Sequence, residues 1–122
     1  MHDFCLKNEI KVKHPENLND ESVSNYIKSL NPDVVVVTAY GKIIPKKILE
    51  IKKGRFINIH ASLLPKWRGA APIQRSIMSL DKETGITIMK INEELDSGPI
   101  SNKYKINLDQ NLNEYESVSY TH

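Results

Sequence analysis

The stretch Asp-Val-Val-Val-Val-Thr, residues 33–38, decides the fold class of this chain. Four consecutive valines favour a strand, because β-branched side chains pack well on a pleated surface. A strand that is apolar on both faces is typical of a parallel sheet covered by helices. We therefore expect residues 33–38 to form a strand that is buried on both faces.

Helices and further strands are expected on either side of this strand. Before it, Asn19 and Asp20 are good N-caps for a helix that carries Val23, Ile27 and Leu30 on one stripe. A short strand is also expected at residues 9–12. After it, the pattern predicts helices at residues 45–51, 72–80 and from 111 onward. It predicts strands at residues 56–60, 86–91 and 100–106. This alternation predicts an α/β fold with a mostly parallel sheet flanked by helices, ending in an antiparallel strand pair.

The composition excludes several classes of protein. The 122 residues suffice for one domain at most, and 39% hydrophobic and 26% charged residues are ordinary for a soluble globular chain. A formal net charge of +2 is too small to indicate a nucleic-acid partner by itself. The single cysteine excludes an internal disulfide framework, and no secretory signal or membrane-spanning run is visible. We expect a cytoplasmic protein.

Two polar side chains lie on one face of the strand expected at residues 56–60. Side chains alternate along a strand, so Asn58 and His60 share one face while Ile57 and Ile59 share the other. Ligands of open α/β sheets bind at the carboxyl ends of the strands, where this pair stands. The residues alone leave open whether the pair serves a ligand or satisfies backbone groups of the next loop.

The loop that follows, residues 61–69, is long for a connection in this fold class. Trp67 stands between Lys66 and Arg68, an arrangement that suits stacking on a nucleic-acid end or a pterin-like ring. A solvated basic turn with the tryptophan packed as a lid is the more frequent arrangement. Asp96 precedes Ser-Gly between two expected strands, which is also a common turn. No close set of histidine, cysteine and carboxylate residues predicts a metal site.

At this point the motifs resemble a known family. The segment Asn58-Ile-His-Ala-Ser-Leu-Leu-Pro65 is similar to the signature of formyltransferases that use 10-formyltetrahydrofolate. In that family the Asn and His of the signature work with an Asp from a Leu-Asp-Ser/Thr-Gly loop, which here is Asp96. The continuation, Lys66-Trp-Arg-Gly-Ala-Ala-Pro-Ile-Gln-Arg75, resembles the branch that acts on methionyl-tRNA.

The resemblance runs from about residue 8 to residue 106 and implies a partial Rossmann-like formyltransferase domain. The implied reaction transfers a formyl group from 10-formyltetrahydrofolate to the amino group of initiator methionyl-tRNA, in translation initiation. It needs no metal, and the full-length form is expected to be a monomer without membrane contact. Acceptors such as a sugar-nucleotide amine or glycinamide ribonucleotide remain alternatives, as does a non-catalytic folate-binding remnant.

The resemblance also implies roles for particular residues. The catalytic residues are expected to be Asn58, His60 and Asp96. The folate-binding residues are expected to be Tyr40, Gly41, Ser62, Leu63, Leu64 and Pro65. The candidates for tRNA contact are Lys66, Arg68 and Arg75.

Two parts of the family's architecture have no counterpart in this sequence. One is the opening strand with its Gly-Thr-Pro turn, and the other is the C-terminal tRNA-binding domain. Residues 1–122 are therefore expected to be a partial catalytic domain that is inactive by itself.

Overall fold

The computed structural model describes residues 1–108, and a mixed sheet of four strands in the order β1-β2-β3-β4 forms its centre. The strands are β1 (Val35–Thr38), β2 (Phe56–His60), β3 (Glu83–Lys90) and β4 (Ile100–Asn107). The pair β1–β2 is parallel, whereas β2–β3 and β3–β4 are antiparallel.

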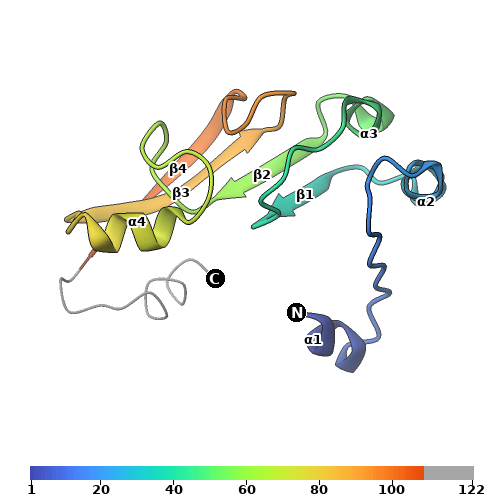
Figure 1. Cartoon of the computed structure of the whole chain (residues 1–122), viewed down its shortest axis with the longest axis horizontal. Helices are drawn as coiled ribbons and strands as arrows, with labels where there is room; N and C mark the ends of the chain where they lie inside the picture. Colours follow the sequence, from blue (N-terminus) through green and yellow to red (C-terminus); the bar gives the residue numbers. More distant parts are fainter. Residues whose placement is uncertain (109–122) are drawn as a thin grey trace.

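Helices lie at both ends of this sheet (Figure 1). They are α1 (His2–Lys7), α2 (Glu21–Leu30), α3 (Lys46–Leu49), its 3₁₀ continuation η1 (Glu50–Lys52) and α4 (Pro72–Met78). In Figure 1, α2 and α3 lie beside β1 and β2, α4 runs along β3, and α1 stands apart on an extended segment. No helix within residues 1–108 is long and apolar enough to cross a membrane.

The core forms where α2 and α3 meet one face of β1 and β2. Ile48 and Phe56 are only 1% and 3% exposed, and Val35 and Val37 pack against them. Helix α2 contributes its apolar stripe to the same cluster, as its helical spacing requires. Full burial of one such side chain contributes about 1.5–3 kcal/mol, so this cluster anchors the strands that carry the polar pair.

The α/β class and the C-terminal antiparallel pair are confirmed. Asp20 occupies the N-cap position of α2, but its side chain makes no capping hydrogen bond; Pro72 occupies the first turn of α4, as predicted. Among the described strands the sheet is less parallel than predicted, because β2 pairs antiparallel with β3. The strand expected at residues 9–12 does not form, and α1 was not predicted. The helix expected from residue 111 lies outside the described residues.

The valine strand differs from the prediction in one respect. Val36 is 57% exposed, although Val35 and Val37 face the core. The reason is that, among the described helices, α2 and α3 pack on the opposite face of β1, and α4 lies near β3, where Ser76 contacts Thr84. The prediction of a strand buried on both faces was therefore wrong for the described structure.

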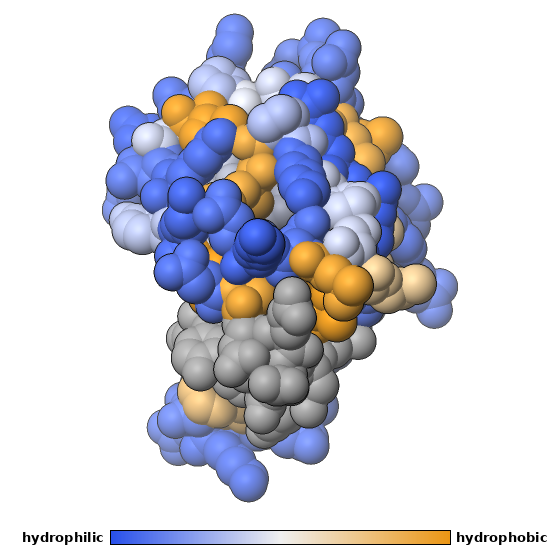
Figure 2. Space-filling model, turned by 90° about the vertical axis from the view of Figure 1, so that its left-hand side faces the viewer, coloured by the Kyte–Doolittle hydropathy of each residue, from blue (hydrophilic) through white to orange (hydrophobic). Residues whose placement is uncertain are grey.

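The surface near α4 is mostly hydrophilic with scattered apolar patches (Figure 2). Met78 and Leu80, at the end of α4, are 82% and 69% exposed. Isolated exposed apolar side chains are common on folded proteins, so these two identify no site by themselves.

Candidate active site

Strand β2 places Asn58 and His60 on the face that carries Phe56 of the core. Asn58 lies between Val37 of β1 and Met89 of β3 in the strand register. His60 follows two residues later and is 7% exposed. The period of two along the strand therefore brings both polar side chains to the sheet's end, as predicted.

Asp96 reaches the same place from the loop between β3 and β4. The loop folds back tightly, so that a Cβ added at Gly98 would lie 1.7 Å from the carbonyl oxygen of Lys90. Asp96 itself adopts a left-handed backbone with φ of 49°, which Asp tolerates better than most residues. The close approach at Gly98 thus holds this loop against the end of β3, two residues after Asp96.

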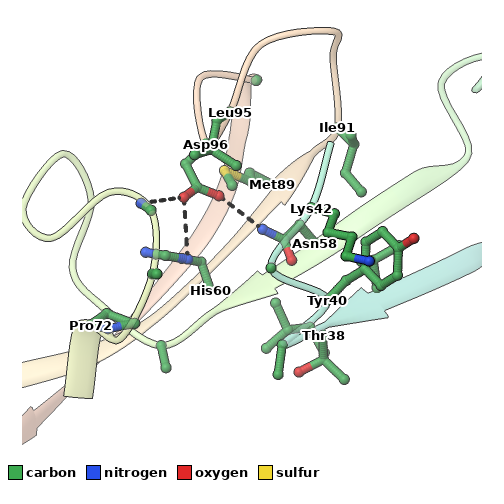
Figure 3. Close-up of a pocket in the computed structure, with 18 of the residues that line it drawn as sticks. Thr38, Tyr40, Lys42, Asn58, His60, Pro72, Met89, Ile91, Leu95 and Asp96 are labelled. Atoms are coloured by element: carbon green, nitrogen blue, oxygen red, sulfur yellow. Dashed lines mark hydrogen bonds and ion pairs between the residues drawn. The ribbon is translucent and has the colours of Figure 1, made fainter. Parts of the chain in front are cut away.

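The Asp96 carboxylate is buried and has three neighbours (Figure 3). Its Oδ2 accepts a hydrogen bond from the Gly69 backbone N–H at 2.7 Å, and its Oδ1 accepts one from Asn58 Nδ2 at 3.2 Å. His60 Nδ1 lies 3.7 Å from Oδ2, and the two side chains are only 8% and 6% exposed. A buried carboxylate is costly unless it is paired, and these neighbours supply the pairing. The structure therefore brings the three predicted catalytic residues together.

A cavity of about 700 Å³ opens at the carboxyl ends of β1 and β2, beside these three side chains. Its apolar lining includes Val37, Ile44, Met89, Ile91 and Leu95. Its polar lining includes Asn58, His60 and Asp96, which contact one another. A mostly apolar cavity of this size with a few convergent polar groups is typical of a small-molecule site.

The predicted folate-binding residues divide into two groups. Tyr40 and Gly41 line the cavity, as does the loop at residues 92–98 except Glu93. Ser62, Leu63, Leu64 and Pro65 do not line it. This segment lies against β3 instead. The Thr87 hydroxyl donates to the Ser62 carbonyl at 2.7 Å and accepts from the Leu64 N–H at 3.1 Å. Ser62 and Leu64 thus tie the loop to β3, and folate contact by these four residues stays a prediction.

The predicted tRNA contacts also differ in their surroundings. Lys66 Nζ donates to Asp81 Oδ1 at 2.6 Å, and the Arg75 guanidinium stacks on the Trp67 ring at 4.8 Å. Arg68 is exposed and supplies its backbone carbonyl to Arg75 at 3.0 Å. All three residues are exposed, but Lys66 and Arg75 have side-chain contacts that hold the loop.

Asp81 is a residue whose role the sequence did not indicate. Its Oδ2 accepts from the Trp67 indole Nε1 at 2.6 Å, and its side chain is 9% exposed. Burial alone would raise the pKa of Asp81, but the hydrogen bonds from Lys66 and Trp67 outweigh it and hold that pKa below its usual value. Its place before a strand resembles an ordinary turn, so no local signal distinguished it.

Sequence comparison identifies relatives of the chain. The profile of the family described as Formyl transferase matches residues 4–120. A methionyl-tRNA formyltransferase of Pelagibacter ubique is 59% identical over 100 residues, which cover 81% of this chain and 32% of that protein. A methionyl-tRNA formyltransferase of Clostridioides difficile is 48% identical over 110 residues, covering 90% and 36%. The chain thus spans about a third of the length of these relatives.

Solved structures share the fold. Phosphoribosylglycinamide formyltransferase from Bacillus halodurans superposes with a TM-score of 0.84 at 26% identity, covering 97% of this chain and 64% of that one. A formyltetrahydrofolate deformylase from Pseudomonas syringae pv. tomato gives a TM-score of 0.77 at 27% identity, covering 98% and 42%.

Proposed function

The chain belongs to the formyl transferase family, and on that premise we propose that its cavity serves formyl transfer from 10-formyltetrahydrofolate to initiator methionyl-tRNA. The observation that carries the proposal is the meeting of Asn58, His60 and Asp96 beside an apolar cavity of about 700 Å³. The relatives named methionyl-tRNA formyltransferase, at 47–59% identity, support this acceptor.

The cavity suits the formyl donor, which is a substrate of the reaction. Apolar walls such as Val37, Ile91 and Leu95 can enclose a flat heteroaromatic ring. Tyr40 and Gly41 belong to the segment that follows β1, and this segment lines part of the cavity. Figure 3 shows Tyr40 and Lys42 across the cavity from Asp96, so a bound donor would lie between these two sides.

In the proposed reaction the methionine nitrogen attacks the formyl carbon and the bond from that carbon to N10 of the folate breaks. Negative charge develops on the formyl oxygen between these two events. The Asn58 amide has two N–H groups, of which one donates to Asp96. We assign the second to the formyl oxygen, because preorganised donors at a developing oxyanion are usually the largest single contribution to such a step.

Proton movement must accompany the transfer, since the attacking nitrogen loses a proton and N10 gains one. His60 is the group in the cavity suited to carry that proton. Asp96 can orient His60 as an ion pair when the ring is charged, or can relay the proton through water. The separation of 3.7 Å between Nδ1 and Oδ2 supports the orienting role.

The exposed Arg68 is the proposed contact for the phosphates of the tRNA acceptor end. Lys66 and Arg75 are weaker candidates, because Lys66 already bonds Asp81 and Arg75 already bonds the Arg68 carbonyl. We further propose that the protein acts as a monomer in the cytoplasm.

The test compares wild type with Asn58→Ala in the full natural chain, measuring transfer of labelled formyl to methionyl initiator tRNA. Loss of one oxyanion donor is expected to lower kcat by about 10²–10³, with a smaller change in the KM for the donor. Glycinamide ribonucleotide and a sugar-nucleotide amine serve as competing acceptors. Preferential formylation of either, or an unchanged kcat in Asn58→Ala, would contradict the proposal.

A further inference from the structure

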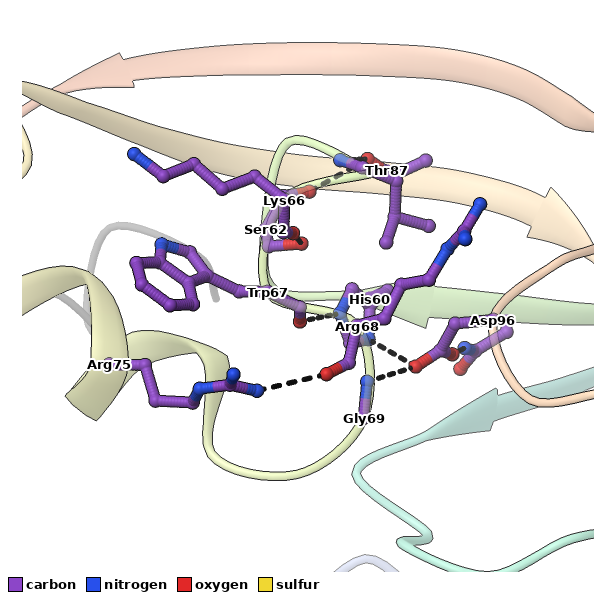
Figure 4. A network of polar contacts seen from close by, with 11 residues as sticks. His60, Ser62, Lys66, Trp67, Arg68, Gly69, Arg75, Thr87 and Asp96 are labelled. Carbon is purple, nitrogen blue, oxygen red and sulfur yellow. Dashed lines mark hydrogen bonds and ion pairs between the residues drawn. The ribbon is translucent and has the colours of Figure 1, made fainter.

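A contact with the backbone carbonyl of Trp67 bears on which nitrogen of His60 carries the proton. His60 Nε2 lies 2.9 Å from this oxygen (Figure 4). A carbonyl oxygen can only accept a hydrogen bond, so Nε2 must carry a hydrogen in either protonation state. In the neutral ring Nδ1 is then an acceptor, and this nitrogen is the one that faces Asp96.

The carbonyl is held in place by contacts of the Trp67 side chain. Trp67 has a φ of 60°, a left-handed conformation that is unfavourable for a bulky residue and needs support from its surroundings. The indole Nε1 donates to Asp81 Oδ2 at 2.6 Å. Arg75 stacks on one side of the ring at 4.8 Å, and Lys66 Nζ lies 5.3 Å from the ring centroid. The indole–carboxylate pair of Trp67 and Asp81 is the directional part of this support.

The rest of the loop is anchored separately. Ser62 Oγ donates to the Lys66 carbonyl at 2.6 Å, and Arg75 donates to the Arg68 carbonyl at 3.0 Å. These contacts fix the residues before and after Trp67. The bond from the indole to Asp81 is the contact that acts on the Trp67 side chain itself.

We propose that the Trp67–Asp81 pair positions the Trp67 carbonyl and so holds neutral His60 with its proton on Nε2 and its lone pair on Nδ1. Asp81 is then a positioning residue, acting through Trp67 on His60. Nδ1 can accept the proton that the attacking amine loses, which gives an imidazolium that donates at both nitrogens. Only this last consequence rests on the proposed function.

The test is ¹⁵N NMR of the imidazole nitrogens in the full natural chain, with His60 assigned by the loss of its signals in His60→Gln. Wild type should show a protonated Nε2 and an unprotonated Nδ1 in the neutral ring. Trp67→Phe keeps the aromatic ring but removes the N–H donor, and Asp81→Ala removes the acceptor. Both should give a mixture of the two tautomers, while Asp81→Asn, which keeps an acceptor oxygen, should restore the wild-type pattern in part.

Glu83→Gln is the matched control. Glu83 starts β3 and pairs with Lys105 at 3.0 Å, so the change removes a carboxylate near Asp81 without touching the loop. A neutral wild-type ring with its proton on Nδ1 would overturn the proposal, as would an unchanged tautomer in a folded Trp67→Phe chain. If Asp81→Ala does not fold, Trp67→Phe and Asp81→Asn decide the matter.

A kinetic measurement separates this proposal from the proposed function. Trp67→Phe should lower kcat by up to about 10²-fold, the lower range for general acid–base catalysis, and alter its pH profile with little change in donor KM. The tautomer measurement does not depend on activity. If the NMR spectrum shows the predicted tautomer but the chain transfers no formyl group, only the proposed function is refuted. If the chain transfers formyl groups but His60 has its proton on Nδ1, only the positioning role of the Trp67–Asp81 pair is refuted.

Discussion

Replacing Gly98 by alanine should displace Asp96 from its partners without altering any of the polar side chains at the cavity. The added Cβ would lie 1.7 Å from the Lys90 carbonyl oxygen and 2.8 Å from its carbon. Both atoms belong to the backbone at the end of β3, so neither can rotate away. Because real Cβ contacts are essentially never shorter than 3.0 Å, the loop must open by roughly 1.3 Å.

An opening of this size is large compared with the contacts that hold Asp96. Its bonds from Gly69 N and Asn58 Nδ2 measure 2.7 Å and 3.2 Å, and the second is already near the limit of a hydrogen bond. Misplacement of a catalytic group by about 1 Å costs about 10²-fold in rate. We therefore expect Gly98→Ala to lower kcat about 10²-fold while the fold is retained.

The assay is formyl transfer to methionyl initiator tRNA, with thermal unfolding followed in parallel. Gly54→Ala is the control, because Gly54 has a φ of 74° with nothing within 4 Å of an added Cβ. It should lower the free energy of unfolding by about 1 kcal/mol through backbone strain and leave kcat unchanged. A folded Gly98→Ala enzyme with wild-type kcat would refute the reasoning that links the close approach at Gly98 to the position of Asp96.

Three further predictions concern the loop at residues 61–69 and two side chains that contact it, those of Asp81 and Thr87. The pKa of Asp81 is lowered in the folded state, so its contribution to stability is present above the ordinary value of 3.8 and is lost as the pH falls through the lowered pKa. The difference in urea midpoint between wild type and Asp81→Asn should therefore shrink as the pH falls below about 4. A difference that stays constant with pH would contradict this. Thr87→Val leaves the Ser62 carbonyl and the Leu64 N–H without their shared partner and should cost about 1–3 kcal/mol in urea unfolding, whereas Thr87→Ser, which keeps the hydroxyl, should cost less. Arg68→Ala should weaken tRNA binding and reduce the salt dependence of affinity by about one unit of slope, with donor KM unchanged; an unaltered salt slope would remove Arg68 from the interface.

Several parts of the fold could be predicted from sequence because they depend on local geometry. Strand β2 was predicted with its observed bounds, and its period of two was enough to place Asn58 and His60 on one face. The first-turn Pro72 follows from the backbone N–H that a helix start leaves unpaired, and the helix before β1 begins directly after Asp20. The resemblance to a family added Asp96, which no local pattern distinguished from an ordinary turn.

Other features depend on which segments pack together. The antiparallel direction of β3 relative to β2 depends on how these two strands pair. The exposure of Val36 depends on which helices pack on its face of the sheet. Short-range sequence patterns specify neither. The segment from Ser62 to Pro65 carries the family signature, yet its backbone bonds to Thr87 hold it away from the cavity.

The sequence by itself determined the alternation of elements after residue 20 and the facing of the polar pair, since these follow from residues that are neighbours along the chain. Only the tertiary structure decided which atoms meet at the site. His60 Nε2 lies at hydrogen-bond distance from the Trp67 carbonyl, His60 Nδ1 faces Asp96, and the Trp67 indole donates to Asp81. Hydrogen bonds of this kind require separations near 3 Å, and packing between distant segments sets such distances.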